Sequence, residues 1–220
     1  MKKLTIIGAG FVGRAIAEVF IKAGYDVMIS NSRGAASLSS IVSGIPQCKA
    51  GDISEAIAFS DVILIAIPFT QISTLPAAAL AGKIIIDANN YYPQRDGHIL
   101  ELDNRQTTTS QIVARHLPEA RVIKAFNAIL AVDVVKHAGQ TPPMRALPVA
   151  GDDTEAKQRV MMMQRDAGFE AVDAGSLSES WRFERAKPCY CIPMDKDTLI
   201  SALAAAQRDV EAEEGSWRQS

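Results

Sequence analysis

The stretch "GAGFVG" at residues 8–13 sets three glycines at the spacing Gly-x-Gly-x-x-Gly. An apolar, strand-like run at residues 3–7 precedes it, and a helical pattern with Ile16, Val19 and Phe20 on one face follows as far as Gly24. In such a unit the first glycine permits a tight turn, the second lets the backbone approach a pyrophosphate, and the third lets helix and strand pack closely. The stretch therefore predicts a dinucleotide-binding turn at a helix N-terminus. A glycine-rich turn without a ligand is the competing interpretation.

Beyond this unit, apolar runs alternate with helical patterns. Strands are predicted near residues 3–7, 27–29, 62–67, 84–87, 122–126, 146–150 and 170–172, and helices near 12–23, 35–43, 53–59, 71–80, 109–116, 131–138, 153–167 and 195–213. The runs "VILIAI" and "IIID" are continuously apolar, as in strands buried on both faces. We expect an α/β protein with a doubly wound, mostly parallel Rossmann-type sheet covered by helices on both faces. Residues 1–220 are predicted to form one domain, with a core at 1–140 and a C-terminal extension at 141–220 that continues the same sheet.

Composition limits the classes of partner. The chain has 220 residues, is 48% hydrophobic and carries a net charge of −2, so it offers no general attraction to nucleic acid or an anionic membrane. Its three cysteines and three histidines lack metal-binding spacing, which predicts reduced thiols and no metal site. Glycines interrupt the apolar start of the chain, and no run approaches the roughly 18 apolar residues that span a bilayer. We expect a soluble, cytoplasmic protein with a small-molecule partner; its oligomeric state stays open, with a homodimer as one option.

The end of the second predicted strand indicates which dinucleotide binds. In proteins that bind NAD, an Asp or Glu about 20 residues after the glycines holds the ribose 2′-hydroxyl. Here Asn31, Ser32 and Arg33 occupy that place, and residues 28–36 contain no acid. An arginine offers charge-assisted hydrogen bonds to a 2′-phosphate, which an acid would repel. The predicted cofactor is NADP; a solvated surface arginine is the competing interpretation.

Ligands of open α/β sheets lie beyond the carboxyl ends of the strands. Those ends carry Ile67 and Pro68 after one strand, Asn89 after the next and Asn127 after another. The rigid turn at Pro68 could provide an apolar wall, and the two asparagines could donate to a ribose or a carboxamide. Asparagine also favours turns, so ordinary turn residues remain an equal interpretation.

Seven segments of the chain resemble, in order and spacing, the reductases that move hydride between NADPH and the deazaflavin coenzyme F420. They are "IIGAGFVGRAIA", "SNSRG", "DVILIAIPF", "GKIIIDANNYY", "ARVIKAFNAI", "LPVAGDD" and "DAGSLSESWRFE". The cytosolic part of six-transmembrane metalloreductases is similar. The resemblance places NADP-binding positions at Gly8, Gly10, Phe11, Val12, Gly13, Ser32, Arg33, Ile67 and Pro68. With Ala9, Asn31, Asn89 and Asn127 these form the predicted cofactor site; positions that bind the electron acceptor are not matched.

The resemblance implies an NADPH-dependent oxidoreductase that transfers hydride between NADP(H) and coenzyme F420 or a flavin-like acceptor. Such chemistry is performed by the cofactors, so the absence of an evident catalytic set of side chains is consistent with it. A flavin or ferric reductase and a non-catalytic NADPH-binding redox sensor are the alternatives. A hydroxyacid or imine reductase is disfavoured, because the residues after Val149 are too few for the helical domain that such enzymes add.

Two further expectations concern the acceptor side. His98, in the loop after the fourth predicted strand, is the one candidate proton donor, with a merely exposed histidine as the alternative. A helix predicted to begin near Ser178 and the segment after it, with Trp181, Arg182, Phe183 and Arg185, could close one side of a site for a planar anionic ring. A core aromatic pair with surface arginines is the competing interpretation of that segment.

Overall fold

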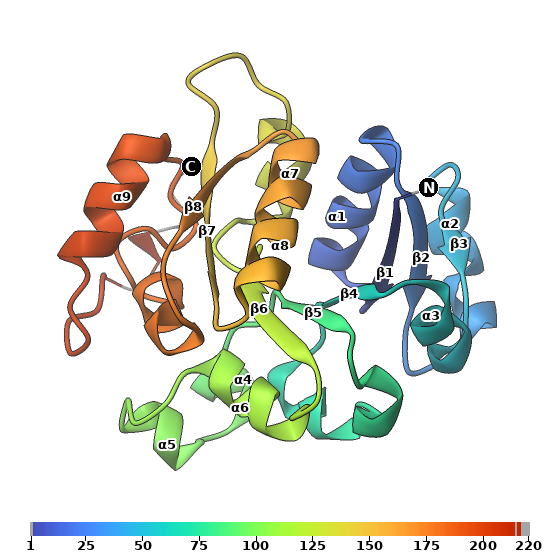
Figure 1. The fold of residues 1–220 in the computed structure, drawn as a ribbon, viewed down its shortest axis with the longest axis horizontal. Coiled ribbons are helices and arrows are strands. Elements are labelled where there is room, and N and C mark those ends of the chain that lie inside the picture. Colours follow the sequence, from blue (N-terminus) through green and yellow to red (C-terminus); the bar gives the residue numbers. More distant parts are fainter. Residues whose placement is uncertain (1, 214, 217–220) are drawn as a thin grey trace.

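A computed structural model describes residues 2–213 and 215–216 of the chain. Its centre is one eight-stranded sheet with the strand order β3-β2-β1-β4-β5-β6-β7-β8 (Figure 1). The strands are β1 (Lys3–Ile7), β2 (Asp26–Ser30), β3 (Lys49–Ala50), β4 (Val62–Ile65), β5 (Ile84–Asp87), β6 (Arg121–Ala125), β7 (Ala146–Gly151) and β8 (Glu170–Asp173). The doubly wound α/β fold predicted from the sequence is confirmed, including the continuation of the sheet by the C-terminal segment.

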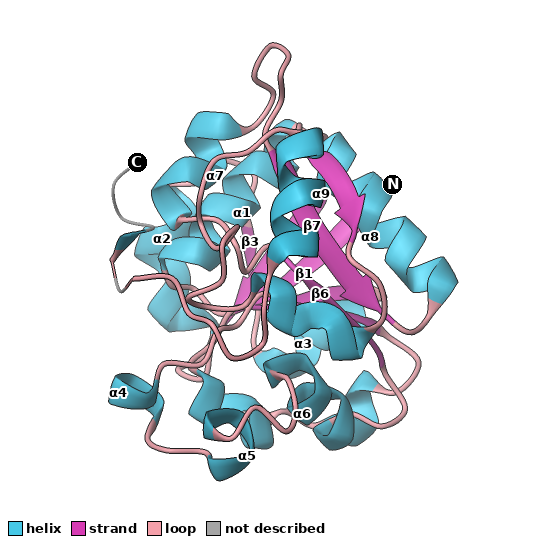
Figure 2. Cartoon of the chain, turned by 90° about the vertical axis from the view of Figure 1, so that its left-hand side faces the viewer, coloured by secondary structure: helices cyan, strands magenta, loops and turns pink. Residues whose placement is uncertain are grey.

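Helices cover both faces of this sheet (Figure 2). The α-helices are α1 (Phe11–Lys22), α2 (Ser39–Ser43), α3 (Ile53–Phe59), α4 (Pro93–Asp96), α5 (Leu100–Asp103), α6 (Thr109–His116), α7 (Ala131–His137), α8 (Thr154–Asp166) and α9 (Lys196–Ala205). The 3-10 helices are η1 (Ala35–Leu38), η2 (Phe69–Thr74), η3 (Ala77–Leu80) and η4 (Leu177–Phe183). Among the described residues, none of these helices combines the length and apolar character that crossing a bilayer requires.

The core consists of two layers, one on each face of the sheet. Helices α1, α7 and α8 cover one face, where the ring of Phe126 meets Phe20 and Phe169 edge-on at centroid distances of 5.8 Å and 6.5 Å. Helices α3 and α6 cover the other face through Ile57 and Val113. The central strands are therefore buried on both sides, as their continuously apolar sequences predict.

The sheet is mostly parallel, as predicted, but its last two strands, β7 and β8, run opposite to the other six. The strands from β3 to β6 pair in parallel, as do β7 and β8, but β7 runs antiparallel to β6. The register pairs at this junction are Ile123 with Gly151, Lys124 with Ala150 and Ala125 with Val149. The apolar sequence of β7 shows that it is buried but carries no information on its direction.

Several element boundaries also differ. The helix predicted at 71–80 is the pair of 3-10 helices η2 and η3, separated by Pro76, and the helix predicted at 195–213 ends at Ala205. The helix expected from Ser178 is the 3-10 helix η4. Strand β3 and helices α4 and α5 have no counterpart in the prediction because each is too short to show a hydrophobic period.

Candidate functional site

The three glycines of the turn between β1 and α1 have different surroundings. Gly8 has φ +124°, and a Cβ there would lie 2.1 Å from the carbonyl oxygen of Ala66. A Cβ at Gly13 would lie 1.9 Å from the carbonyl oxygen of Gly8. A Cβ at Gly10 would meet nothing within 4 Å. Gly8 and Gly13 are thus required for packing, whereas the space at Gly10 is open to a ligand.

The first turn of α1 is suited to an anion. Among the residues that the structure describes, no side chain caps the start of α1 at Gly10, and the first turn holds no acidic residue. The backbone N–H of Arg14 bonds the carbonyl oxygen of Gly10 at 3.1 Å, so α-helical pairing begins only there. The N–H groups before it and the positive end of the helix dipole therefore attract negative charge.

A cavity of about 670 Å³ opens beside this turn. It is bounded by the glycine turn, the end of β2, the end of β4 and the 3-10 segment that follows. Its lining is Ile7, Gly8, Ala9, Gly10, Asn31, Ser32, Arg33, Gly34, Asp52, Ile53, Ala66, Ile67, Pro68, Gln71, Thr74, Leu75 and Pro76. The structure thus gathers most of the predicted cofactor residues around one space; Phe11, Val12, Gly13, Asn89 and Asn127 are outside its lining.

The residues after β2 form a turn that presents Arg33. The Oδ1 of Asn31 accepts from the backbone N–H of Arg33 at 2.9 Å, and its Nδ2 donates to the hydroxyl of Ser37 at 3.0 Å. Asn31 therefore shapes the turn, while the Ser32 and Arg33 side chains are exposed at the cavity. In the part of the chain that the structure describes, no ion pair involves Arg33, so its charge is available to a ligand.

Asp52 is a cavity residue that sequence reasoning missed. It caps α3: its carboxylate accepts from the N–H of Glu55 at 2.9 Å and from the hydroxyl of Ser54 at 2.8 Å. The hydrogen bond from the Glu55 backbone, followed by that from the Ser54 hydroxyl, lowers the pKa of this carboxyl, which is therefore ionised at neutral pH. The capping-box pattern Asp-x-x-Glu at residues 52–55 marks the start of α3, and this pattern could have identified Asp52 from the sequence.

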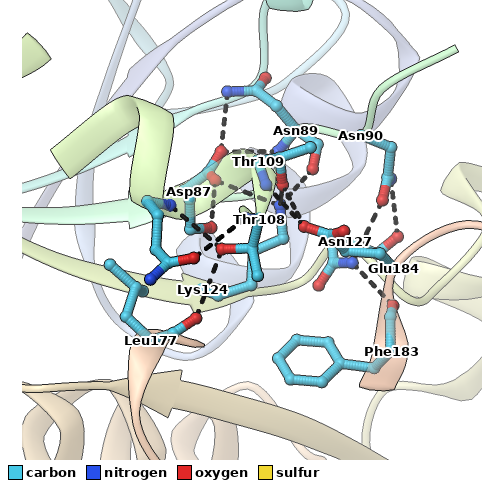
Figure 3. A network of polar contacts seen from close by, with 12 residues as sticks. Asp87, Asn89, Asn90, Thr108, Thr109, Lys124, Asn127, Leu177, Phe183 and Glu184 are labelled. Carbon is cyan, nitrogen blue, oxygen red and sulfur yellow. Dashed lines mark hydrogen bonds and ion pairs between the residues drawn. The ribbon is translucent and has the colours of Figure 1, made fainter. Parts of the chain in front are cut away.

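Asn89 lies in a polar network at the carboxyl ends of β5 and β6 (Figure 3). Its Oδ1 accepts from the backbone N–H of Ile67 at 2.8 Å, and its Nδ2 donates to Asp87 at 2.9 Å. The side chain therefore ties the end of β4, which borders the cavity, to β5. Direct contact of Asn89 with a nucleotide stays a prediction.

Asn127 ties β6 to the C-terminal segment. Its Nδ2 donates to the carbonyl oxygen of Phe183 at 2.9 Å and to Oδ1 of Asn90 at 3.2 Å (Figure 3). Phe126, immediately before it, has φ +61°, a strained conformation that turns the chain sharply at the end of β6. The Oδ1 of Asn127 is buried and has no hydrogen-bond partner among the described residues. A role for Asn127 in binding a nucleotide also stays a prediction.

Beneath these asparagines lies a charged pair that the sequence reading overlooked. The Nζ of Lys124 donates to Oδ2 of Asp87 at 3.1 Å and to Oγ1 of Thr109 at 2.9 Å, and both charged side chains are fully buried. Thr109 in turn donates from its backbone N–H to Glu184 at 2.8 Å. The network thus connects β5, β6, α6 and the residues after η4 (Figure 3). The signal in the sequence was a lysine in the middle of an apolar strand.

The expectations for the acceptor side are corrected in part. Phe183 is fully buried, and Arg182, whose guanidinium pairs with Glu179 at 2.7 Å, does not line the cavity beside it. Trp181 and Arg185 do border a cavity of about 220 Å³. His98 is exposed, bonds Asp103 at 2.9 Å and lines neither this cavity nor the one at the glycine turn. The interpretation of His98 as an exposed surface residue therefore holds.

Comparison with known proteins extends these observations. A family model described as "NADP oxidoreductase coenzyme F420-dependent" matches residues 3–91. The chain is 30% identical over 203 residues to metalloreductase STEAP3 of Rattus norvegicus, an alignment that covers 91% of this chain and 39% of the rat protein. The chain therefore spans about two fifths of the length of that relative.

Solved structures show the same architecture. A hypothetical protein from Sinorhizobium meliloti is 30% identical with a TM-score of 0.79, over 90% of this chain and 97% of that one. A protein from Arthrobacter sp. FB24, described as a candidate F420-dependent NADP-reductase, shares the fold with 23% identity and a TM-score of 0.72, over 82% of this chain and 87% of that one. Residues 3–91 thus match the NADP oxidoreductase family described as coenzyme F420-dependent, and the whole chain shares its fold with a chain of nearly equal length.

Proposed function

We propose that the protein is an NADPH-dependent oxidoreductase that passes hydride between NADP(H) and a deazaflavin or flavin-like acceptor. The observation that carries this proposal is a cavity that combines the open space at Gly10, the uncapped first turn of α1 and the charge of Arg33, which forms no ion pair with any described residue. The match of residues 3–91 to the NADP oxidoreductase family supports the same proposal.

The open space and the charges that line the cavity suit NADP. The pyrophosphate would lie at Gly10 and the N–H groups of the first turn of α1, where no Cβ or acid interferes. The 2′-phosphate would be held by Arg33 and Ser32, which flank the cavity at the end of β2. Ile67 and Pro68 would form an apolar wall at the end of β4. Gly8 and Gly13 act through the backbone geometry that brings these groups together.

The bound nucleotide would supply the two electrons as hydride. The chain itself would bind and orient the two reacting rings and would keep water away from them. This is the main contribution of a protein to chemistry between two cofactors. The strand ends that would border the nicotinamide are fixed by Asn89, Asn127 and the buried Lys124–Asp87 pair. No side chain is assigned a proton-transfer role.

The acceptor is proposed from the relatives. The family description and the Arthrobacter relative name coenzyme F420, which favours a deazaflavin. The rat relative is a metalloreductase, which makes a flavin or ferric reductase the second candidate.

A panel of acceptors tests the proposal. Oxidation of NADPH and of NADH is followed by absorbance, without oxygen, with coenzyme F420, FMN, FAD and ferric chelates. We expect turnover with at least one ring acceptor and a preference for NADPH. Turnover with ferric chelates alone would favour the second candidate. Tight NADPH binding without turnover of any acceptor would contradict enzyme function and support a nucleotide-binding redox sensor.

A further inference from the structure

A cavity of about 970 Å³ opens at the amino ends of β1 and β4, away from the glycine turn. It is bounded by the start of β1, the turn between α3 and β4, the last turns of α8, and Tyr25. It is larger than the cavity at the glycine turn and shares no lining residue with it. Its volume is at the upper end of the roughly 300–1,000 Å³ that small-molecule sites occupy. We call it the amino-edge cavity.

Two acidic side chains line the amino-edge cavity, and both already have partners. The carboxylate of Asp166 accepts from Nζ of Lys2 at 2.7 Å and from the hydroxyl of Tyr25 at 2.6 Å. Asp61 pairs with Lys83 at 3.1 Å. Neither acid therefore neutralises the remaining cations of the cavity.

The remaining cationic side chains of the cavity have no acidic partner among the described residues. Lys3, Arg159 and Arg165 line the cavity, are exposed, and form no ion pair in the part of the chain that the structure describes. Burial raises the pKa of Tyr25, and the charge of Arg159 acts against that rise, so the guanidinium is near the Tyr25 hydroxyl. Positive charges gathered around one hollow attract an anion, and the guanidinium of arginine matches the geometry of a phosphate.

The rest of the cavity is suited to a ring. Met162 and Met163 lie three and four residues after Arg159 on α8, which puts them on the same face of the helix, and Met162 is 56% exposed. The half-buried ring of Phe59 lines the cavity from the end of α3, and the ammonium of Lys3 is 4.9 Å from its centroid. Aromatic rings and thioethers make favourable contacts with planar ligands. The cavity thus combines an apolar surface for a ring with cations for its charges.

The cavity beside Trp181 also contains cations, but two of them are committed within the protein. Arg105 pairs with Glu211 at 3.2 Å. Lys187 donates to three backbone carbonyl oxygens of residues 207–210 at distances between 2.8 and 2.9 Å. Positive charge is therefore more available to a ligand at the amino-edge cavity.

We propose that the amino-edge cavity binds a nucleoside phosphate, with its phosphate groups at Arg159 and Arg165 and its base against the ring of Phe59. This site is separate from the one proposed for NADP(H). Strand β1 begins beside the amino-edge cavity and ends at Ile7 beside the glycine turn, so ligands at its two ends can be bound at the same time. The inference does not depend on hydride-transfer activity.

Calorimetry on protein saturated with NADP⁺, which keeps the glycine-turn cavity filled, measures the binding of ADP and of pyrophosphate. We expect saturable binding of ADP and weaker binding of pyrophosphate, because only ADP carries a base. Arg159→Glu and Arg165→Glu should each weaken ADP binding by about tenfold or more, through the loss of one charge-assisted contact with a phosphate.

Lys196→Glu is the matched control. It makes the same change in net charge at an exposed lysine of α9 that does not line the cavity. It should change the affinity for ADP by less than about twofold, because salt screens distant charges.

The outcomes separate this inference from the proposed function. If NADP⁺ does not bind but ADP binding depends on Arg159 and not on Arg33, the proposed cofactor site fails and the amino-edge site stands. The inference is overturned if the wild type does not bind ADP, or if Arg33→Ala weakens that binding and Arg159→Glu does not. It is also overturned if Lys196→Glu weakens ADP binding as much as Arg159→Glu, or if pyrophosphate binds as tightly as ADP, because the base would then contribute nothing.

Discussion

Lys124 and Asp87 are register partners on β6 and β5. Their side chains form an ion pair of 3.1 Å, and both are fully buried. Removing one member of such a pair leaves an uncompensated buried charge. We expect Lys124→Met to lower the free energy of unfolding by about 3–5 kcal/mol in urea denaturation. The additional change Asp87→Asn should recover part of this loss.

The matched control is Lys22→Met, which breaks the exposed ion pair between Lys22 and Glu18 on α1. That change should cost at most about 1 kcal/mol, because water solvates both ends of the pair. Equal costs for the two substitutions would show that the Lys124–Asp87 pair does not hold β5 and β6 together.

The three glycines of the turn should separate stability from binding. Gly10→Ala has free space, so the protein should unfold at the same urea concentration as wild type while its affinity for NADPH falls. Gly8→Ala and Gly13→Ala place a Cβ about 2 Å from a backbone oxygen and should destabilise the fold itself. Unfolding midpoints and NADPH titrations of the three variants test this. A Gly10→Ala protein with wild-type affinity would show that the pyrophosphate does not lie there.

Arg33 should provide most of the preference for NADPH over NADH. A charge-assisted contact with a phosphate contributes about 1.5–3 kcal/mol, so Arg33→Ala should weaken NADPH binding by roughly ten- to a hundredfold. NADH binding should hardly change because NADH has no 2′-phosphate. Ser32→Ala should have a smaller effect of the same kind. Dissociation constants for both nucleotides provide the measurement.

Salt is the internal control for this prediction. Added salt should erode the preference of the wild type but not that of Arg33→Ala, because only a charged contact is screened. A mutant that keeps its preference for NADPH would mean that residues 31–33 form only a turn.

The buried thiols should make stability depend on alkaline pH. Burial raises the pKa of Cys189 and of Cys191 to about 12 and that of Cys48 to about 11. In the unfolded chain these thiols ionise near pH 8.5, so below that value both states are protonated and stability is complete. As pH rises further, the unfolded state releases protons that the fold retains, and the free energy of unfolding falls until the folded pKa is passed.

Urea unfolding at about pH 8 and pH 10 measures this loss. The variant Cys48→Ala, which removes one of the three groups, should lose less stability between the two pH values than wild type. An identical loss in both proteins would mean that other groups, such as Tyr25, whose pKa is also raised by burial, dominate the effect.

Sequence reasoning was strongest where one local pattern determines the structure. The glycine spacing and the apolar runs of β1, β4 and β5 predicted the central unit, because a buried parallel strand needs a continuous apolar sequence. The sequence also predicted that Asn31, Ser32 and Arg33 belong to one site, because they directly follow β2. All three line the cavity. Whether these residues bind NADP remains a prediction.

Features that depend on contacts between distant segments could not be predicted. The direction of β7 follows from where α7 and the next loop bring the chain, and the sequence of the strand is compatible with either direction. The burial of Lys124 depends on Asp87, which is 37 residues away. The sequence also does not show that Phe11 is exposed, because apolar residues of an amphipathic helix usually face the core.

The antiparallel junction between β6 and β7 has a consequence for amide exchange. Every residue that lines the cavity beside the glycine turn lies between Ile7 and Pro76, on the far side of that junction from β7, α8 and β8. The unit β7-α8-β8 is built from neighbouring segments of the chain and is well placed to open as a cooperative block of its own. Nucleotide binding would then slow exchange in β1, β2 and β4 while β7 and β8 continue to exchange at their own rate, so the two halves of one continuous sheet would differ in protection.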